Sequence, residues 1–286
     1  MSTLNAILLG LIQGLTEFLP ISSSAHISIF GQLMGTTNPG AAFTAIIQIG
    51  TETAVLLYFR RDIWNILSAW FACLFGRNGK DLQHRLGSNN VDARMGWYII
   101  MGSLPIVILG VLFDDAIETY LRNLWITATM LIVFAIILYI ADTLSRQNLN
   151  NKDLNTARAI VYGIAQALAV IPGVSRSGGV ISAGLFMNFS RVSAAKYAFL
   201  LAMPAVFGSG VYELIKAVMH NEYTAALGFP GWGPTVIATL VAFIVGYLVI
   251  IAFLKIISTY SYKLFSYYRL VLGIAVIIML LTGVLQ

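Results

Sequence analysis

Long apolar runs alternate with short polar segments along this chain. Six of the runs approach or reach the roughly 20 residues that a helix needs to cross a bilayer. They lie at about 41–59, 96–113, 123–141, 194–219, 235–257 and 270–285. No run shows the residue-by-residue alternation of a transmembrane β-strand. The pattern therefore predicts an all-α polytopic membrane protein with six transmembrane spans.

Two further apolar runs are too short to span, and each ends at a proline. They lie at about 6–18 and 160–171, and they end at Pro20 and Pro172. Short apolar segments of this kind predict two re-entrant helical hairpins. Irregular backbone at membrane depth is tolerated only where it is buried in protein or lines a watery cavity. We therefore expect the polar residues after each proline to face each other as the two walls of a site.

Composition supports the membrane class, and the distribution of charge gives an orientation. Charged residues make up 10% of the chain, against about 25% in soluble domains, and the mean hydropathy is +0.83. Basic residues gather in 60–95, in 142–158 and after the fifth span, where Lys263 and Arg269 lie, whereas 114–122 and 220–234 are poor in them. The positive-inside rule then places the basic connections in the cytoplasm and both termini outside. The net charge of +5, spread in this way, does not indicate nucleic-acid binding.

The segment 63–75 is apolar but short, and it lies within the first basic connection. Trp64 and Trp70 suggest a helix that lies in the cytoplasmic interface. A seventh span is disfavoured because it would reverse the charge bias of the loops that follow.

The two hairpins resemble each other in sequence. GLIQGLTEFLPISSSAH (10–26) aligns with GIAQALAVIPGVSRSGG (163–179) at an offset of 153, which pairs glycine, glutamine, leucine and two serines. We therefore expect a single membrane domain over 1–286 with repeat one at about 1–141, repeat two at about 158–286 and a cytoplasmic connection at 142–157. An odd number of spans in each half makes the second half inverted relative to the first. The first hairpin then enters from outside and the second from the cytoplasm, and the two meet near the bilayer midplane.

The second hairpin carries the sequence PGVSRSGG (172–179). Its glycines permit a tight loop with an exposed backbone, Ser175 and Ser177 can donate hydroxyls or cap the next helix, and Arg176 offers five donors suited to phosphate oxygens. A helix that begins here would add its amides and its positive dipole end. These features predict an oxyanion cradle with phosphate as its ligand. The alternative is an arginine that ties the loop to backbone carbonyls.

The first hairpin places Gln13 and Glu17 four residues apart, on one helical face. A carboxylate at this depth needs a cation, a proton or a hydrogen-bonding partner, and hard cations such as Mg²⁺ and Ca²⁺ take carboxylate, amide and phosphate oxygens. The alternative is a protonated Glu17 bonded to a neighbouring helix. Glu52, on the first span, either joins this site or is buried and protonated.

His26 and three serines follow Pro20. The histidine is a candidate nucleophile, general acid or phosphate ligand, and its alternative role is a structural hydrogen bond. Ser22, Ser23 and Ser24 include possible helix caps.

EFLPISSSAH with the preceding Gln13, taken together with PGVSRSGG, resembles the bacterial undecaprenyl pyrophosphate phosphatases of the bacitracin-resistance type. The likeness covers the whole chain, including both motifs and the distance between them in the sequence. The family motifs fall on three groups of residues in this sequence: Gln13 and Glu17; Ser22, Ser23 and His26; and Pro172, Gly173, Ser175, Arg176 and Ser177.

The resemblance implies hydrolysis of undecaprenyl pyrophosphate to undecaprenyl phosphate and inorganic phosphate, in cell-wall lipid-carrier recycling and bacitracin resistance. It implies a divalent metal, Mg²⁺ or Ca²⁺, and a site open to the outer face of the bacterial plasma membrane. Glu17, His26, Ser23 and Arg176 are then expected to be catalytic. Substrate binding is expected from Ser22, Ser175, Ser177, Gly173 and Gly178, and metal binding from Glu17, Gln13 and Glu52.

Two positions depart from the family pattern. Gln13 stands where many members have Glu, so one anionic metal ligand is missing or is supplied elsewhere, for instance by Glu52. Val180 stands where a Thr often follows the Ser-Arg-Ser loop, so a hydroxyl contact is absent.

A transporter or flippase of an anionic or lipid-phosphate substrate is the alternative function, because inverted repeats with broken helices are typical of secondary transporters. The nucleophile is left open between His26, Ser23 and water. A homodimer is also left open.

Overall fold

The computed structural model describes residues 2–35, 41–77, 79, 81–113, 120–121, 123–219 and 229–285. Within these ranges the chain forms helices, short connections and one isolated bridge between Leu149 and Phe189. The α-helices are α1 (Thr3–Thr16), α2 (Ser23–Leu33), α3 (Ala41–Tyr58), α4 (Arg60–Leu74), α5 (Leu82–Arg85), α6 (Val91–Leu112), α8 (Leu124–Leu144), α9 (Thr156–Ala167), α10 (Arg176–Phe186), α11 (Arg191–Met219), α13 (Trp232–Ile257) and α14 (Lys263–Leu281). Two short 3₁₀ turns, Asn151–Asp153 and Leu168–Val170, complete the described structure.

The helical content and the lengths of the helices confirm the polytopic α-helical class. Five described helices, α6, α8, α11, α13 and α14, are long and apolar enough to cross a membrane. A sixth span results if α3 and α4, which meet at a bend of 78°, are counted together as one broken span. Each predicted span therefore coincides with a helix.

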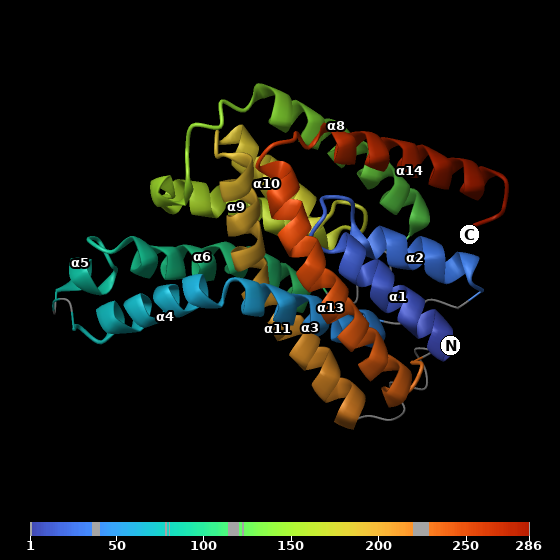
Figure 1. Ribbon diagram of the computed structural model, residues 1–286, viewed down its shortest axis with the longest axis horizontal. Helices are drawn as coiled ribbons and strands as arrows, with labels where there is room; N and C mark the ends of the chain where they lie inside the picture. Colours follow the sequence, from blue (N-terminus) through green and yellow to red (C-terminus); the bar gives the residue numbers. More distant parts are fainter. Residues whose placement is uncertain are drawn as a thin grey trace.

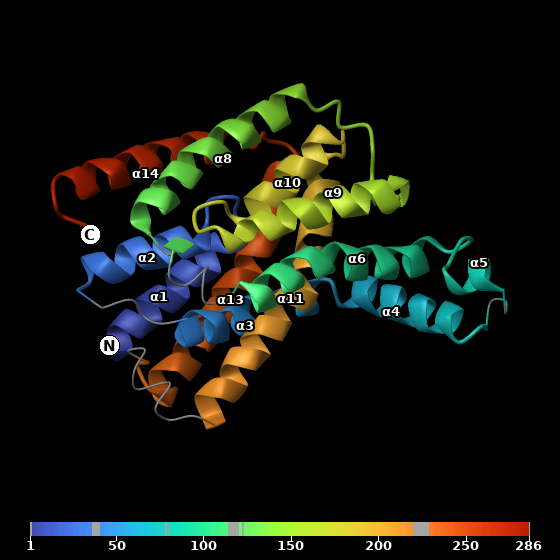
Figure 2. The same cartoon turned by 180° about the vertical axis from the view of Figure 1, so that it is seen from behind.

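Figures 1 and 2 show how these helices are arranged. Helices α8 and α14 lie side by side in both views, next to the α1–α2 hairpin. Helices α4, α5 and the start of α6 form an arm at the opposite end of the molecule from the beginning of α1. Because of the bend after α3, helix α4 packs along α6. The predicted position of 63–75 in the membrane interface stays a prediction. The two connections predicted to be poor in basic residues, 114–122 and 220–234, lie mostly outside the described residues. The undescribed parts are 114–119, 122 and 220–228.

The last span begins earlier than its hydropathy suggested. Helix α14 starts at Lys263, so Arg269 lies well inside a helix and is 0% exposed. Its assignment to a cytoplasmic loop is therefore wrong. The cause is the segment YKLFSYYR (262–269), whose polar, aromatic and basic side chains interrupt the hydropathy although the helix already runs through them.

The two hairpins have the same local geometry. Helices α2 and α10 occupy 23–33 and 176–186, which are the same positions at the offset of 153. Their N-caps, Ser22 and Ser175, have φ of 72° and 67°, a left-handed conformation that costs free energy for a non-glycine residue. Each cap accepts a hydrogen bond from the amide three residues later, in Ala25 and Gly178. Helix α1 has 14 residues, about 21 Å at 1.5 Å per residue, which is shorter than a bilayer core of about 30 Å.

Close backbone contacts hold the first helix of each hairpin against a long helix. A Cβ atom on Gly10 of α1 would lie 2.4 Å from the carbonyl oxygen of Ala238 in α13. A Cβ atom on Gly163 of α9 would lie 2.9 Å from Gly102 in α6. These glycines, which pair at the offset of 153, therefore allow the helix backbones to approach directly.

Candidate active site

Three charged side chains from separate parts of the chain meet where the hairpins face each other. Nη2 of Arg176, on α10, forms ion pairs with Oε1 of Glu17 after α1 and with Oε1 of Glu52 on α3, the latter at 3.1 Å. The Glu17 and Glu52 side chains are 4% and 1% exposed, and that of Arg176 is 17% exposed. Because both carboxylates bond the same nitrogen, they share one small buried volume.

The second oxygen of Glu17 accepts two further hydrogen bonds. The Gln13 side-chain amide donates to Oε2 at 2.7 Å, and the Ser23 hydroxyl donates to the same atom at 2.6 Å. Gln13 reaches Glu17 because the two residues are one helical turn apart at the end of α1. Three donors, from Gln13, Ser23 and Arg176, therefore converge on one carboxylate. The predicted grouping of these residues holds in the structure.

Two oxygens of this cluster have no partner among the described residues. Gln13 Oε1 and Glu52 Oε2 are buried and unpaired, although buried polar atoms are almost always hydrogen-bonded. The cluster also pairs two carboxylates with one guanidinium, which leaves one negative charge uncompensated when all three groups are ionised. Carboxylate and amide oxygens are the ligands of Mg²⁺ and Ca²⁺, so Gln13, Glu17 and Glu52 fit a divalent cation. No group of three or more His, Cys, Asp or Glu that could hold a metal occurs in the described ranges.

The serines of the second motif hold the loops in place. Ser177 Oγ donates to the carbonyl oxygens of Leu19 at 3.0 Å and Glu17 at 3.3 Å, so it joins the second hairpin to the first. Ser175 caps α10 and Ser22 caps α2. The hydroxyls of Ser22, Ser175 and Ser177 thus form hydrogen bonds within the protein. Their predicted role in binding substrate stays a prediction.

Arg269 on α14 connects the two hairpin loops. It donates to the carbonyl oxygens of Pro20 at 3.1 Å, Gly173 at 2.8 Å and Val174 at 3.0 Å. Two carbonyls of α8 complete its contacts at 3.4 Å each, those of Met130 and Leu131. Gly173 has φ of 91°, where a side chain would be strained, and a Cβ atom there would lie 2.3 Å from the Thr127 carbonyl oxygen.

The sequence interpretation missed Arg269, but its spacing carries a signal. Ser266, Arg269, Gly273 and Val276 are the buried residues of α14, and their spacing of three and four residues defines one helical face. Gly178 lies against this arginine, because a Cβ atom there would be 2.6 Å from Arg269 Nη1. Its predicted role in binding substrate stays a prediction.

The hydrogen-bond partners of the His26 ring lie outside the cluster of Gln13, Glu17, Ser23, Glu52 and Arg176. Its Nδ1 lies 2.7 Å from the carbonyl oxygen of Ser22, and its Nε2 lies 2.7 Å from the hydroxyl of Tyr268 on α14. His26 is 3% exposed. Among the described interactions, none joins its ring to Glu17 or Arg176. Both ring nitrogens are thus engaged, and Tyr268 is a second residue that sequence reasoning did not find.

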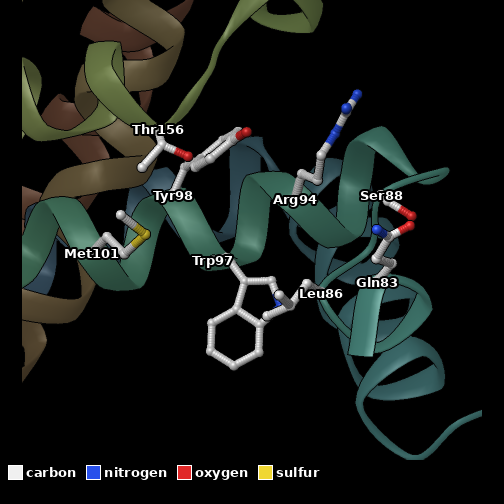
Figure 3. A pocket seen from close by; sticks show the side chains of 8 residues that line it. All are labelled: Gln83, Leu86, Ser88, Arg94, Trp97, Tyr98, Met101 and Thr156. Carbon is white, nitrogen blue, oxygen red and sulfur yellow. The ribbon is translucent and has the colours of Figure 1, made fainter. Parts of the chain in front are cut away.

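The cavity drawn in Figure 3 is separate from this cluster. It has a volume of about 570 Å³ and lies between the α5 region, α6 and the start of α9. It is lined by Gln83, Leu86, Ser88, Arg94, Trp97, Tyr98, Met101 and Thr156. None of the residues expected from the motifs belongs to this lining.

Comparisons with known proteins connect the geometry to a family. The family described as "Bacitracin resistance protein BacA" matches residues 6–275. The "Undecaprenyl-diphosphatase" of Bifidobacterium animalis subsp. lactis (strain AD011) is 60% identical over 286 residues, which cover 100% of this chain and 96% of that protein. The "Undecaprenyl-diphosphatase" of Paenarthrobacter aurescens (strain TC1) is 54% identical over 281 residues, with 98% of both chains covered.

Proposed function

This chain belongs to the bacitracin resistance protein BacA family, and we propose that it hydrolyses undecaprenyl diphosphate to undecaprenyl phosphate and inorganic phosphate. Relatives that cover nearly its whole length bear the name of that phosphatase. The observation that carries the proposal is the convergence of the two motifs, in which Arg176 and Ser23 contact the same carboxylate of Glu17. The product would return to cell-wall synthesis as a lipid carrier.

Arg176 is the residue that binds the diphosphate. Its planar guanidinium matches phosphate oxygens, and its side chain keeps some exposure while both carboxylates beside it are buried. The substrate's oxygens would compete with Glu17 and Glu52 for these N–H groups. Because both the ligand and the cluster are negatively charged, binding requires a further positive charge.

A divalent cation, Mg²⁺ or Ca²⁺, fits that requirement. Glu17, Glu52 and the free oxygen of Gln13 would hold it together with phosphate oxygens of the substrate, as Mg²⁺ sites with few protein carboxylates do. When bound, the cation supplies charge neutralisation at the transferring phosphoryl group and its leaving group.

Ser23 is the proposed nucleophile, and Glu17 is its general base. The Ser23 hydroxyl already donates to Glu17 Oε2 at 2.6 Å, within the range in which a base takes a proton. Attack of Oγ on the terminal phosphorus breaks its bond to the bridging oxygen. Undecaprenyl phosphate leaves, and water then hydrolyses the phosphoserine to free phosphate. Arg176 stabilises the charge that develops on the phosphoryl oxygens.

The orientation of the site and the repeat are further parts of the proposal. The basic connections favour a cytoplasmic position for the arm of α4 and α5, which leaves the hairpin cluster accessible from the outer face. The matched caps and bounds of α2 and α10 support two inverted repeats at about 1–141 and 158–286.

Phosphate release from a long-chain polyprenyl diphosphate by the purified protein tests the function. The assay is run with Mg²⁺, with Ca²⁺ and with EDTA, alongside folded Arg176→Ala and Glu17→Ala variants. We expect cation-dependent release that both variants abolish. Substrate binding without release under any of these conditions would instead favour a carrier of the lipid phosphate.

A further inference from the structure

The contacts of His26 define the proton positions on its ring. Nδ1 lies 2.7 Å from the carbonyl oxygen of Ser22, and a carbonyl oxygen only accepts hydrogen bonds. Nδ1 therefore carries a proton. In the neutral imidazole, Nε2 is then an acceptor, and the Tyr268 hydroxyl donates to it at 2.7 Å.

Other contacts hold Tyr268 in position. The rings of His26 and Tyr268 are nearly parallel, at 4°, with centroids 5.7 Å apart. The next residue, Arg269, is bonded to Pro20 and Gly173, which fixes this turn of α14 against both hairpin loops. Ala25 and Ile29 of α2 also belong to a buried cluster that includes Val276 of α14. The tyrosine hydroxyl is therefore presented to the histidine by a fixed helix.

The same contacts continue to the proposed nucleophile. Ser22 has φ of 72°, a conformation that persists only where surrounding contacts hold it. His26 donates to the carbonyl of that residue, and the next residue, Ser23, donates to Glu17. The chain of contacts thus runs from Tyr268 through His26 and Ser22 to the hydroxyl that faces the carboxylate.

We propose that Tyr268 is a positioning residue of the active site, which orients His26 so that the histidine holds the Ser22–Ser23 turn with the Ser23 hydroxyl against Glu17. This inference rests on the proposed phosphatase function. It gives His26 the task of holding the nucleophile's turn through Nδ1, with Nε2 occupied by the tyrosine. Nothing in this role requires the histidine to touch the substrate.

The kinetic test compares Tyr268→Phe with Tyr267→Phe. Tyr267 is the matched control because it directly precedes Tyr268 on α14. Its ring packs beside that of Tyr139, with the ring centroids 5.9 Å apart. We expect Tyr268→Phe to lower kcat roughly tenfold, the factor that corresponds to one lost hydrogen bond, with KM nearly unchanged. Tyr267→Phe should retain wild-type kcat. A wild-type kcat in Tyr268→Phe would overturn the proposal.

A double-mutant cycle tests whether Tyr268 acts through His26. Adding Tyr268→Phe to His26→Ala should cause no further loss of kcat, because the tyrosine has then lost the group that it orients. An equal tenfold loss in both backgrounds would show that Tyr268 acts independently of the histidine, and would contradict the proposal.

Nitrogen-15 NMR of the full-length protein tests the pairing without any substrate. The chain has three histidines, so comparison with His26→Ala assigns the ring of His26. We expect a protonated Nδ1 in the wild type and a displaced Nε2 resonance in Tyr268→Phe but not in Tyr267→Phe. An Nε2 resonance that is the same in all three proteins would overturn the pairing. If the wild type releases no phosphate, the proposed function fails, while this measurement still decides whether Tyr268 orients His26.

Discussion

The guanidinium of Arg269 donates from Nη1 to the carbonyl oxygen of Pro20, 3.1 Å away in space and 249 positions earlier in the sequence. The same side chain donates to Gly173 and Val174 in the other hairpin loop. One fully buried residue of α14 therefore joins the loop that follows Glu17 to the loop that precedes Arg176.

Replacement of Arg269 by Met should destabilise the protein and abolish activity together. Several buried carbonyl groups lose their donor, and each unsatisfied group costs about 1–3 kcal/mol, so we expect the free energy of unfolding to fall by more than about 3 kcal/mol. Arg269→Lys should be intermediate, because an ammonium group has no planar fork that reaches both loops. Thermal unfolding in detergent and phosphate release measure the two effects.

The control for this change is Arg60→Met. Arg60 is exposed, and within the described residues its side chain donates a hydrogen bond to the Leu57 carbonyl oxygen alone. We expect little change in unfolding or activity there. Equal effects of the two substitutions would mean that Arg269 does not join the loops in the membrane.

A methyl group at Gly178 should disturb the same junction. Its Cβ atom would lie 2.6 Å from Arg269 Nη1 and 3.1 Å from Ser175 Cβ, and neither group has room to move because both are buried and hydrogen-bonded. We expect Gly178→Ala to lower phosphate release at least about tenfold and to lower the melting temperature, because overpacking in a buried site costs about 1–3 kcal/mol.

Gly179→Ala is the matched control for that change. A Cβ atom at Gly179 would meet its nearest neighbour, the Ala165 carbonyl oxygen, at 3.4 Å, which is ordinary contact. The variant should retain its melting temperature and activity. If Gly179→Ala is as damaging as Gly178→Ala, helix propensity or flexibility governs the loop instead of its fit against Arg269.

Much of this fold was predictable because the membrane restricts the possible structures. Backbone groups in lipid must be satisfied within a helix, so the apolar runs alone located the six long helices α3, α6, α8, α11, α13 and α14 of the described ranges. The prolines after two short runs located the hairpins, and the offset of 153 located matching caps at Ser22 and Ser175. Helix ends were less accurate, because α14 begins with residues that are polar or aromatic on the face towards the protein interior.

The site was predictable only in part. Glu17 and Arg176 stood out because ionisable residues are costly inside a membrane. Arg269 did not, because it follows a basic connection and was counted with it. The role considered as an alternative for Arg176, binding loop carbonyls, belongs to Arg269. The hydrogen bond of His26 to Tyr268 could not be predicted either, since the two residues lie 242 positions apart in the sequence.

Ser23→Ala should abolish turnover while leaving the fold intact. Its hydroxyl is the group that donates to Glu17 Oε2, and loss of a nucleophile costs activity by about 10³-fold or more. Ser24→Ala is the control, because the described contact of that hydroxyl is Ser22 Oγ at 3.2 Å, and it should lose less than about threefold. Radiolabelled substrate gives a second measurement, since acid-quenched wild-type enzyme should carry labelled phosphoserine. Full turnover in Ser23→Ala would assign the attack to water.

Metal binding should respond in opposite directions to two changes in the carboxylate cluster. Gln13→Glu replaces an unpaired amide oxygen with an anionic ligand, and Glu52→Gln removes one. A ligand that binds only the folded state raises the melting temperature, and the rise is larger when the ligand binds more tightly. We therefore expect the rise with Mg²⁺ or Ca²⁺ to be larger in Gln13→Glu and smaller in Glu52→Gln than in the wild type.

Gln13→Glu should destabilise the protein when no metal is bound. In EDTA, Gln13→Glu places a second carboxylate against Glu17 and removes the amide that donates to it at 2.7 Å, so its melting temperature should fall below that of the wild type. Asp92→Asn, at the exposed start of α6, is the control and should follow the wild type in both conditions. If all four proteins respond equally to the cation, Gln13 and Glu52 are not ligands. The unpaired oxygens would then mark a protonated Glu52, the alternative that the sequence left open.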